Sequence, residues 1–250
     1  MAYLDKKILL LTNLLLIMFA WSDITKLQVP EGFEIEEFVT EIDDARQMVE
    51  GKNYIFVGTK SAGNVYAIDK NNSNKVLVIL SELDMPTGVA LRNGDLYIAE
   101  TDTIHVVKNI ENKIALDQKI ATEIFFSDLP RKTDWNPVTK AWHGWKWIDF
   151  GPDGALYISE GVPCNVCDED DPRYGTILKL ENNNLSIYAD GVRNSVGFDW
   201  HPVSQEMYFT DNGRDWMGDD IPPCELNRVV SPGDHFGFPF IHGNNIPDDK

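Results

Sequence analysis

The sequence has few cysteines, few basic side chains and, beyond its first residues, no long apolar run. Three cysteines in 250 residues exclude a disulfide-rich scaffold. The 22 lysines and arginines stand against 40 aspartates and glutamates, which gives a formal net charge of −18. Such an acidic surface repels a phosphate backbone, and no basic run interrupts it, so we exclude nucleic acid as a partner. Metal ions, cationic partners and neutral substrates remain compatible with this charge.

A sustained 3.6-residue apolar period is also missing, and no glycine-rich dinucleotide motif follows an apolar strand. These absences exclude a mainly helical fold and NAD chemistry. The chain is 43% hydrophobic and 25% charged, as folded globular proteins are. Short runs rich in Val, Ile, Tyr and Phe alternate with Gly, Asn and Asp turns, which predicts an all-β fold.

The N-terminus has the pattern of a secretory signal. Two lysines at 6–7 precede an apolar run over residues 8–21, and small residues occupy the −3 and −1 positions of a cleavage site before Asp23. We therefore expect a signal peptide at 1–22 and one domain at 23–250, located in the periplasm or secreted. An uncleaved N-terminal anchor is the alternative. After cleavage we expect no stable membrane span.

The three cysteines are Cys164, Cys167 and Cys224. Cys164 and Cys167 form a CxxC pair, but Asp168 follows where a c-type haem attachment has histidine. A four-cysteine zinc site would need a second pair, which the chain lacks. A local disulfide between Cys164 and Cys167 is the favoured interpretation, ahead of redox catalysis. Pairing of Cys224 with either of them stays open.

Four segments of the chain repeat one pattern, in the order strand, tight turn, strand, loop, strand. They follow one another at roughly 40 to 60 residues, a spacing typical of propeller blades. The pattern predicts a β-propeller with about four blades in this chain, and a β-sandwich is the alternative. The four segments are 48–69, 88–108, 147–180 and 196–230.

Strand order in a blade locates a functional face. The loop before the first strand and the loop between the second and third strands share one rim. In the last two units these are the long loops, where binding sites are usually built. His143 lies nine residues before Pro152, and Arg193 lies nine before Pro202, so both should converge on one mouth. The long loops are 128–146, 161–175, 190–193 and 212–224.

Four ordered motifs, at 143–161, 190–202, 210–229 and 233–239, resemble the soluble glucose/sorbosone dehydrogenase family. The resemblance covers roughly residues 80–245 and is closest to the sorbosone-dehydrogenase-like branch. It implies a six-bladed propeller that uses pyrroloquinoline quinone (PQQ) and calcium. It also implies oxidation of a sugar, either an aldose or a sorbosone-like aldehyde, with electrons passed to an external acceptor.

The same resemblance assigns roles to residues. His143 matches the catalytic general base, and Arg193 with Asn194 matches the pair that holds the quinone. Metal-binding positions are matched by Gly213 and Arg214, whose backbone carbonyls would ligate the cofactor calcium, and by Glu225 and the backbone oxygen of Phe236 at a second calcium.

These assignments agree with elementary chemistry. A histidine on the rim can accept a proton from a sugar hydroxyl near neutral pH. A planar arginine fork suits the carboxylates of PQQ, and calcium polarises a quinone carbonyl. The acidic runs at 168–171 and 215–220 could supply oxygen ligands, although a solvated acidic loop is the commoner explanation of such a run.

The chain departs from the family in length, because the family closes six blades and about four are recognised here. The resemblance then implies a product truncated at its C-terminal side, without the basic contacts that further blades give the quinone. Two other functions stay open. One is a non-catalytic propeller that binds sugars or proteins. The other is a calcium-dependent lactonase-type hydrolase, which we disfavour because His143 and Arg193, rather than carboxylates, are expected to face the channel.

Overall fold

The computed structural model describes residues 26–131 and 143–248, so the predicted signal segment 1–22 lies outside the described residues. The chain divides into two units, Met1–Phe38 and Val39–Lys250. The described residues of the first unit form no strand, and they contain a turn in which the Phe33 N–H donates to the Pro30 carbonyl over 3.1 Å. All strands described below belong to the second unit.

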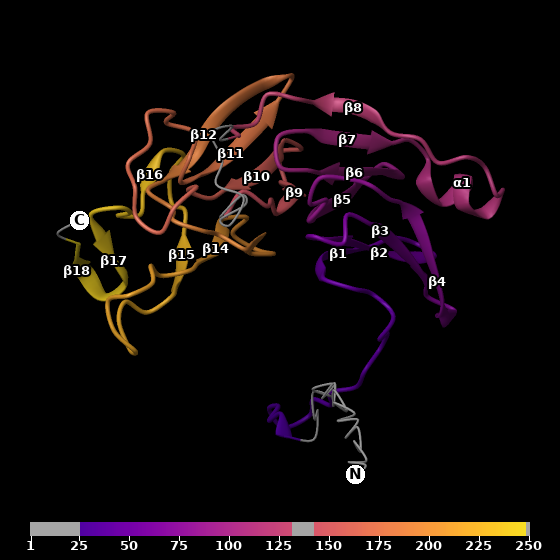
Figure 1. Cartoon of the computed structure of the whole chain (residues 1–250), viewed down its shortest axis with the longest axis horizontal. Helices are drawn as coiled ribbons and strands as arrows, with labels where there is room; N and C mark the ends of the chain where they lie inside the picture. Colours follow the sequence, from indigo (N-terminus) through magenta and orange to yellow (C-terminus); the bar gives the residue numbers. More distant parts are fainter. Residues whose placement is uncertain (1–25, 132–142, 249–250) are drawn as a thin grey trace, which may run out of the picture. The chain divides into compact units, whose positions relative to one another are not determined.

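Four antiparallel sheets follow one another along the second unit (Figure 1), and we call them blades one to four. Blade one contains β1 (Ala45–Glu50), β2 (Tyr54–Thr59), β3 (Val65–Asp69) and β4 (Asn72–Leu80). Blade two contains β5 (Gly88–Arg92), β6 (Asp95–Ala99), β7 (Ile104–Val107) and β8 (Glu123–Phe126). Blade three contains β9 (Ile148–Phe150), β10 (Leu156–Glu160), β11 (Thr176–Glu181) and β12 (Asn184–Asp190). Blade four contains β13 (Gly197–Trp200), β14 (Met207–Asp211) and β15 (Glu225–Arg228).

The prediction of an all-β propeller with four blades is therefore confirmed. The other elements are small. A six-residue helix, α1 (Ile110–Ala115), lies between β7 and β8, and β16 (Asp234–His235) pairs in parallel with β12. After β16 come β17 (Ile241–His242), the 3₁₀ turn η2 (Gly243–Asn245) and β18 (Ile246–Pro247). Within the described part of the chain, no helix has the length and apolar character needed to cross a membrane.

The repeat found in the sequence covers the first three strands of each blade and misses the fourth. The reason is exposure, because the fourth strands are less buried than the middle strands, and none of the four residues of β8 is buried. In β12 only one of the seven residues is buried, whereas all five residues of β10 are buried. A strand that is mostly exposed or half-buried gives a weaker apolar pattern to read in the sequence.

Side-chain alternation in the middle strands packs each blade against both of its neighbours. In β6 of blade two, Leu96 and Ile98 pack into the core shared with blade one. Tyr97, between them, packs into the core shared with blade three. In β10, Ile158 faces blade two and Tyr157 faces blade four. Since successive side chains of a strand point to opposite faces, two apolar faces make an almost continuously apolar strand.

One buried side chain joins the first strands of three blades. Gln47 in β1 is 3% exposed. Its Oε1 accepts the backbone N–H groups of Val89 in β5 and Ile148 in β9, both over 3.1 Å. Its Nε2 donates to the Ile148 carbonyl over 2.7 Å. Gln47 therefore satisfies backbone groups that face the propeller axis, where no strand ladder can reach them.

Candidate functional site

The long loops of blades three and four meet at one rim, as the strand order predicts. The Val162 N–H, just after β10, donates to the Arg193 carbonyl over 3.1 Å, in the segment before β13. The Val192 N–H donates to the Gly175 carbonyl over 2.8 Å. These two backbone bonds fix the segment that carries Arg193 against the loop between β10 and β11.

His143 lies just before β9 and is 5% exposed. Its backbone is left-handed, with φ of 59°, a conformation uncommon for residues other than glycine. Gly161 makes this position possible, because a Cβ on it would lie 2.5 Å from the His143 Cβ. The Nδ1 of His143 lies 2.9 Å from the Val162 carbonyl oxygen. A carbonyl only accepts, so Nδ1 carries the proton of the neutral ring and Nε2 holds the lone pair.

Burial lowers the pKa of His143 to about 4, and the nearby Arg193 guanidinium adds to this effect. The hydrogen bond to the Val162 carbonyl opposes the shift without cancelling it. The imidazole is therefore neutral at pH 7 with a defined tautomer. A general base needs this neutral imidazole with its lone pair on Nε2. A base with such a low pKa is weak, and an anion nearby would raise its pKa.

The side chain of Arg193 is only 4% exposed. Every N–H of its guanidinium has an acceptor from the protein. Nε donates to the Asn165 carbonyl over 2.9 Å, and Nη2 donates to Asn165 Oδ1 over 2.8 Å. Nη1 donates to the carbonyls of Asn212 and Gly213, over 3.1 and 3.0 Å. The longest contact, 3.4 Å, joins Nη2 to Asp215 Oδ2. A carboxylate ligand would therefore have to exchange with one of these partners, and Asp215 is the weakest.

Asp211, at the end of β14, holds the backbone beneath this side chain. Its two carboxylate oxygens accept the N–H groups of Arg193 and Asn194, over 2.8 and 2.6 Å. Burial nevertheless raises the pKa of Asp211 to about 7. Our reading of the sequence missed this residue. A signal exists, because Asp211 follows Met207 and Phe209 at a spacing of two on the buried face of β14.

A buried ion pair close to His143 in the chain, Lys146 with Glu160, was also missed. Lys146 Nζ donates to Glu160 Oε1 and to the Gly144 carbonyl, each over 2.8 Å, and both charged side chains are fully buried. Burial raises the pKa of Glu160, and Lys146 opposes that rise. Among the described residues, Glu160 Oε2 meets no hydrogen-bond donor. The pair anchors the segment 143–146 to the end of β10.

The residues predicted to bind calcium lie in two places. Gly213 is the second residue after the end of β14. Glu225 is the first residue of β15 and pairs with Asp211 in the ladder between β14 and β15. The side chain of Arg214 pairs with Asp248 through Nη1. Phe236 lies between blades three and four, because its N–H donates to the Asp190 carbonyl of β12 over 2.8 Å and its ring meets Phe209 of β14. The geometry groups Gly213, Arg214 and Glu225 on blade four, with the backbone of Phe236 bonded to β12.

Beside this rim a cavity of about 390 Å³ is lined by Arg46, Thr87, Trp145, Asn194 and Asn212, among others. Trp145 connects it to the catalytic candidate, since the Trp145 and His143 rings are 6.0 Å apart between centroids. The ammonium of Lys60 lies 3.8 Å above the Trp145 ring.

These groups fit an anionic, flat cofactor such as PQQ. Arg46 brings a cation to the lining of the cavity, and the Lys60 ammonium lies over the ring of Trp145, another lining residue. Burial and Arg46 lower the pKa of Lys60. An aromatic face and an amide complete the donor set. A calcium ion is also compatible with the Gly213 carbonyl, because a carbonyl oxygen has two lone pairs and Arg193 engages one. A Cβ at Gly213 would meet the Pro222 carbonyl at 2.9 Å, so only glycine allows this loop path.

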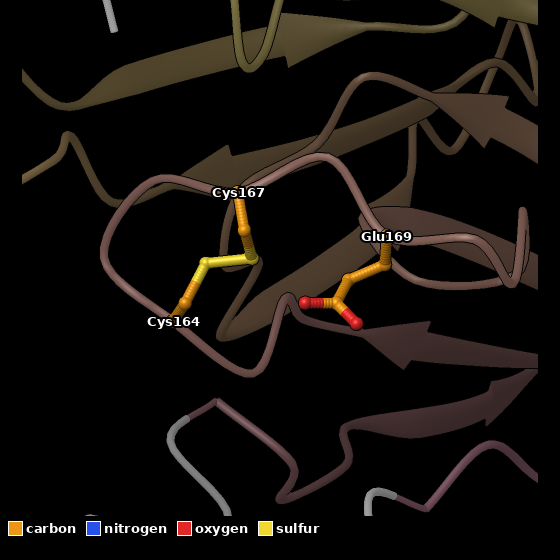
Figure 2. Close-up of side chains that lie close together, drawn as sticks. All are labelled: Cys164, Cys167 and Glu169. Carbon is orange, nitrogen blue, oxygen red and sulfur yellow. A yellow bond between two sulfur atoms is a disulfide. The ribbon is translucent and has the colours of Figure 1, made fainter.

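The favoured local disulfide is confirmed, since Cys164 and Cys167 are bonded and Cys224 is an exposed free thiol. Figure 2 shows the disulfide with the Glu169 carboxylate turned toward it. Within residues 26–131 and 143–248, these three side chains form the one set of His, Cys and carboxylate groups close enough to hold a metal ion. With both sulfurs bonded to each other, that set retains a single carboxylate ligand.

Among known proteins, no family model matches the chain. An uncharacterized protein of Borreliella burgdorferi (strain ATCC 35210 / DSM 4680 / CIP 102532 / B31) is 33% identical over 258 residues, covering 97% of this chain and 65% of the relative. The chain therefore spans less than two thirds of that relative's length.

Solved structures of similar fold include sugar dehydrogenases. The PQQ-bound aldose sugar dehydrogenase of Streptomyces coelicolor has a TM-score of 0.63 at 19% identity, covering 86% of this chain and 69% of that one. The Trichoderma reesei carbohydrate-active enzyme of family AA12 gives 0.64 at 14%, covering 80% and 56%. The PQQ domain of a Coprinopsis cinerea pyranose dehydrogenase gives 0.63 at 11%, covering 83% and 58%. At these identities the likeness establishes the fold, and this chain has the propeller fold of PQQ-dependent sugar dehydrogenases.

Proposed function

We propose that this chain is the sugar-oxidising part of a PQQ- and calcium-dependent dehydrogenase of the glucose/sorbosone type. The single observation that carries the proposal is His143. Its tautomer is fixed by the Val162 carbonyl, its ring is neutral at pH 7, and it lies beside Trp145, which lines the cavity together with Arg46. The similarity in fold to PQQ-bound sugar dehydrogenases supports sugar oxidation in general.

In this proposal His143 accepts the proton of the sugar hydroxyl at Nε2, while Nδ1–H stays bonded to the Val162 carbonyl. Asn194 lines the cavity and, with Arg193, would orient the cofactor's polar edge. The Gly213 and Arg214 carbonyls would hold the cofactor calcium, with Glu225 and the Phe236 backbone assigned to a second ion. When bound, PQQ would supply the two-electron acceptor, and calcium would polarise its carbonyl.

The substrate is proposed to be an aldose or a sorbosone-like aldehyde, and an external acceptor would reoxidise the cofactor. We propose that this chemistry takes place in the periplasm or outside the cell. N-terminal sequencing of exported protein should find a mature chain that begins at or near Asp23. A chain that keeps Met1 would contradict cleavage at 22.

The test is a titration of the purified chain with PQQ, with and without calcium, followed by a dye-reduction assay with a panel of aldoses. We expect a shifted quinone absorbance that needs calcium and sugar-dependent dye reduction. Binding of sugar without quinone or turnover would instead favour the non-catalytic propeller. Hydrolysis of a lactone in calcium without PQQ would favour the lactonase-type hydrolase.

A further inference from the structure

The side chain of Arg193 is fixed from outside its own blade by one residue. Asn165 belongs to the loop between β10 and β11 of blade three, and it supplies two of the acceptors of the guanidinium. Both acceptors are strong ones for a cation, with separations of 2.9 and 2.8 Å. No other residue contributes both a backbone and a side-chain acceptor to Arg193 in the part of the chain that the structure describes.

Asn165 also fixes the loop after β14. The Asp215 N–H donates to Asn165 Oδ1 over 2.8 Å, and Asn165 Nδ2 donates to the Asp215 carbonyl over 3.1 Å. The same loop supplies the Asn212 and Gly213 carbonyls that hold Nη1 of Arg193. One amide side chain therefore ties together the guanidinium and the loop that carries the predicted calcium ligands.

The position of Asn165 depends on a short covalent ring. Asn165 directly follows Cys164, and the disulfide from Cys164 to Cys167 closes the chain around it, with the two Cα atoms 6.1 Å apart (Figure 2). Such a ring removes many of the conformations that an exposed loop otherwise samples. The Asn165 carbonyl and amide are thereby presented to Arg193 together.

We propose that Asn165 is a positioning residue for Arg193, and that the Cys164–Cys167 disulfide is what holds Asn165 in place. Asp211 fixes the backbone of Arg193, and Asn165 fixes its guanidinium. The exchangeable contact that remains is the one to Asp215, so an anionic ligand meets a cation of defined orientation. The inference rests on the proposed function only in treating Arg193 as a group that binds a ligand.

Opening of the ring requires a thiol reductant. A dithiol breaks the S–S bond, supplies two electrons and two protons, and is itself oxidised to a disulfide, leaving Cys164 and Cys167 as thiols. Asn165 is then free to leave Arg193, and the guanidinium loses up to two of its five acceptors.

The test measures access to Arg193 directly and needs no cofactor. The full chain is treated with phenylglyoxal, which modifies arginine, and the labelled position is read by peptide mass spectrometry. Asn165→Ala should increase the labelling rate at Arg193 by about tenfold to a hundredfold, the factor that a hydrogen bond to a charged group carries. The exposed Arg228 should label at an unchanged rate. Asn112→Ala, on the exposed side of α1, is the matched control variant and should change neither rate.

Three further arms separate positioning from general loosening. Asn165→Asp keeps an acceptor oxygen and should keep Arg193 protected. The double variant Cys164→Ser/Cys167→Ser, and the wild-type chain in dithiothreitol, should both expose Arg193. In the Asn165→Ala background, reduction should add less than it adds in the wild type, because the side-chain contact is already gone and only the backbone carbonyl of residue 165 remains to be released.

The proposal is overturned if Asn165→Ala leaves the labelling of Arg193 unchanged, or if Arg193 stays protected after the disulfide is opened. General unfolding is recognised by Arg173, which is held by Asp171 on the same loop but not through Asn165. If the labelling rate of Arg173 rises by the same factor as that of Arg193 in every variant, the positioning role is wrong. Since no quinone is present, this result stands apart from success or failure of PQQ binding.

Discussion

His143 combines a left-handed backbone, a fixed tautomer and a buried ring within one residue. Each feature has a separate cause: the close approach of Gly161, the Val162 carbonyl, and the packing of the rim loops. A residue held in a sparsely populated conformation persists only where its surroundings determine it, and such residues cluster at functional sites. Two consequences can be measured, one on turnover and one on stability.

We expect His143→Gln to lower sugar oxidation by roughly 10² to 10⁴, the usual contribution of a positioned acid–base group. Quinone affinity should change little, because glutamine retains a polar group of similar reach. Stopped-flow dye reduction and a PQQ titration on the same preparation measure the two quantities. Loss of quinone binding with intact turnover would contradict the role assigned to His143.

His143 should also make the fold sensitive to acid. Its pKa is lowered in the folded chain to about 4, so the unfolded chain binds more protons below pH 6.5. The stabilisation is complete above pH 6.5 and is lost as pH falls toward 4, by roughly 3 kcal/mol. Urea unfolding at a series of pH values should show this loss in wild type and its absence in His143→Gln. A parallel pH dependence in both proteins would assign the loss to other groups.

The contribution of Asp211 to stability depends on pH in the opposite direction. Burial raises its pKa to about 7, so its protonated form favours the folded state and that contribution fades as pH rises through 7. Asp211→Ala leaves the N–H groups of Arg193 and Asn194 without acceptors and should cost about 2–4 kcal/mol. Urea unfolding measures the loss, with Asp199→Ala, at an exposed position of β13, as the control. An equal loss of stability in the two variants would contradict the role of Asp211 as the acceptor for these N–H groups.

At the scale of elements, the blades are joined by apolar faces and by Gln47. The apolar cores lie between successive blades, whereas Gln47 binds the inner strands β1, β5 and β9 at once. A polar side chain in such a place is retained because backbone groups at the centre of a propeller have no ladder partner.

Gln47→Leu should destabilise the chain by about 3–5 kcal/mol, because the N–H groups of Val89 and Ile148 and the Ile148 carbonyl all lose their partner. The urea midpoint should fall with an unchanged m value. Gln118→Leu, at an exposed position after α1, is the control. Gln47→Glu should recover stability as pH falls, since only a protonated carboxyl can donate to the Ile148 carbonyl. A midpoint that does not move in Gln47→Leu would exclude this bridging role.

Element by element, sequence reasoning succeeded where a pattern repeats. The tight turns at 151–154 and 201–204 and the strands around them recur in register, which located the rim and the loops that carry His143 and Arg193. It could not find the fourth strands, because their residues are mostly exposed or half-buried and do not repeat the apolar pattern of the middle strands. Nor could it find Asn165 and Lys146, because their partners are brought near only by folding. Asp211 was within reach, since a carboxylate at an apolar position needs a buried partner.

For the whole molecule the dominant quantity is the net charge of −18. Mutual repulsion of so many carboxylates opposes the compact state, and added salt should relieve it. A specific calcium site acts in addition to this screening, because it binds the folded state alone.

Calcium at a hundredfold excess over its dissociation constant should stabilise the chain by about 2.7 kcal/mol, which corresponds to a rise in Tm of roughly 5–10 °C. Thermal melts in calcium and in chelator measure it, with magnesium at equal ionic strength as the control for screening. Glu225→Gln should reduce the calcium increment. Equal melts in calcium and magnesium would mean that the acidic loops are only solvated.

The hydrogen bond from Gln47 to Ile148 spans 101 residues of the chain. During synthesis at about 5–20 residues per second, the ribosome needs roughly 5–20 s to deliver Ile148 after Gln47 has emerged. For that interval the first two blades hold an unpaired amide and an open inner edge. During this interval the N-terminal half of the nascent chain lacks the hydrogen bonds between Gln47 and Ile148. A chaperone or an export channel that keeps chains unfolded therefore has several seconds in which to act.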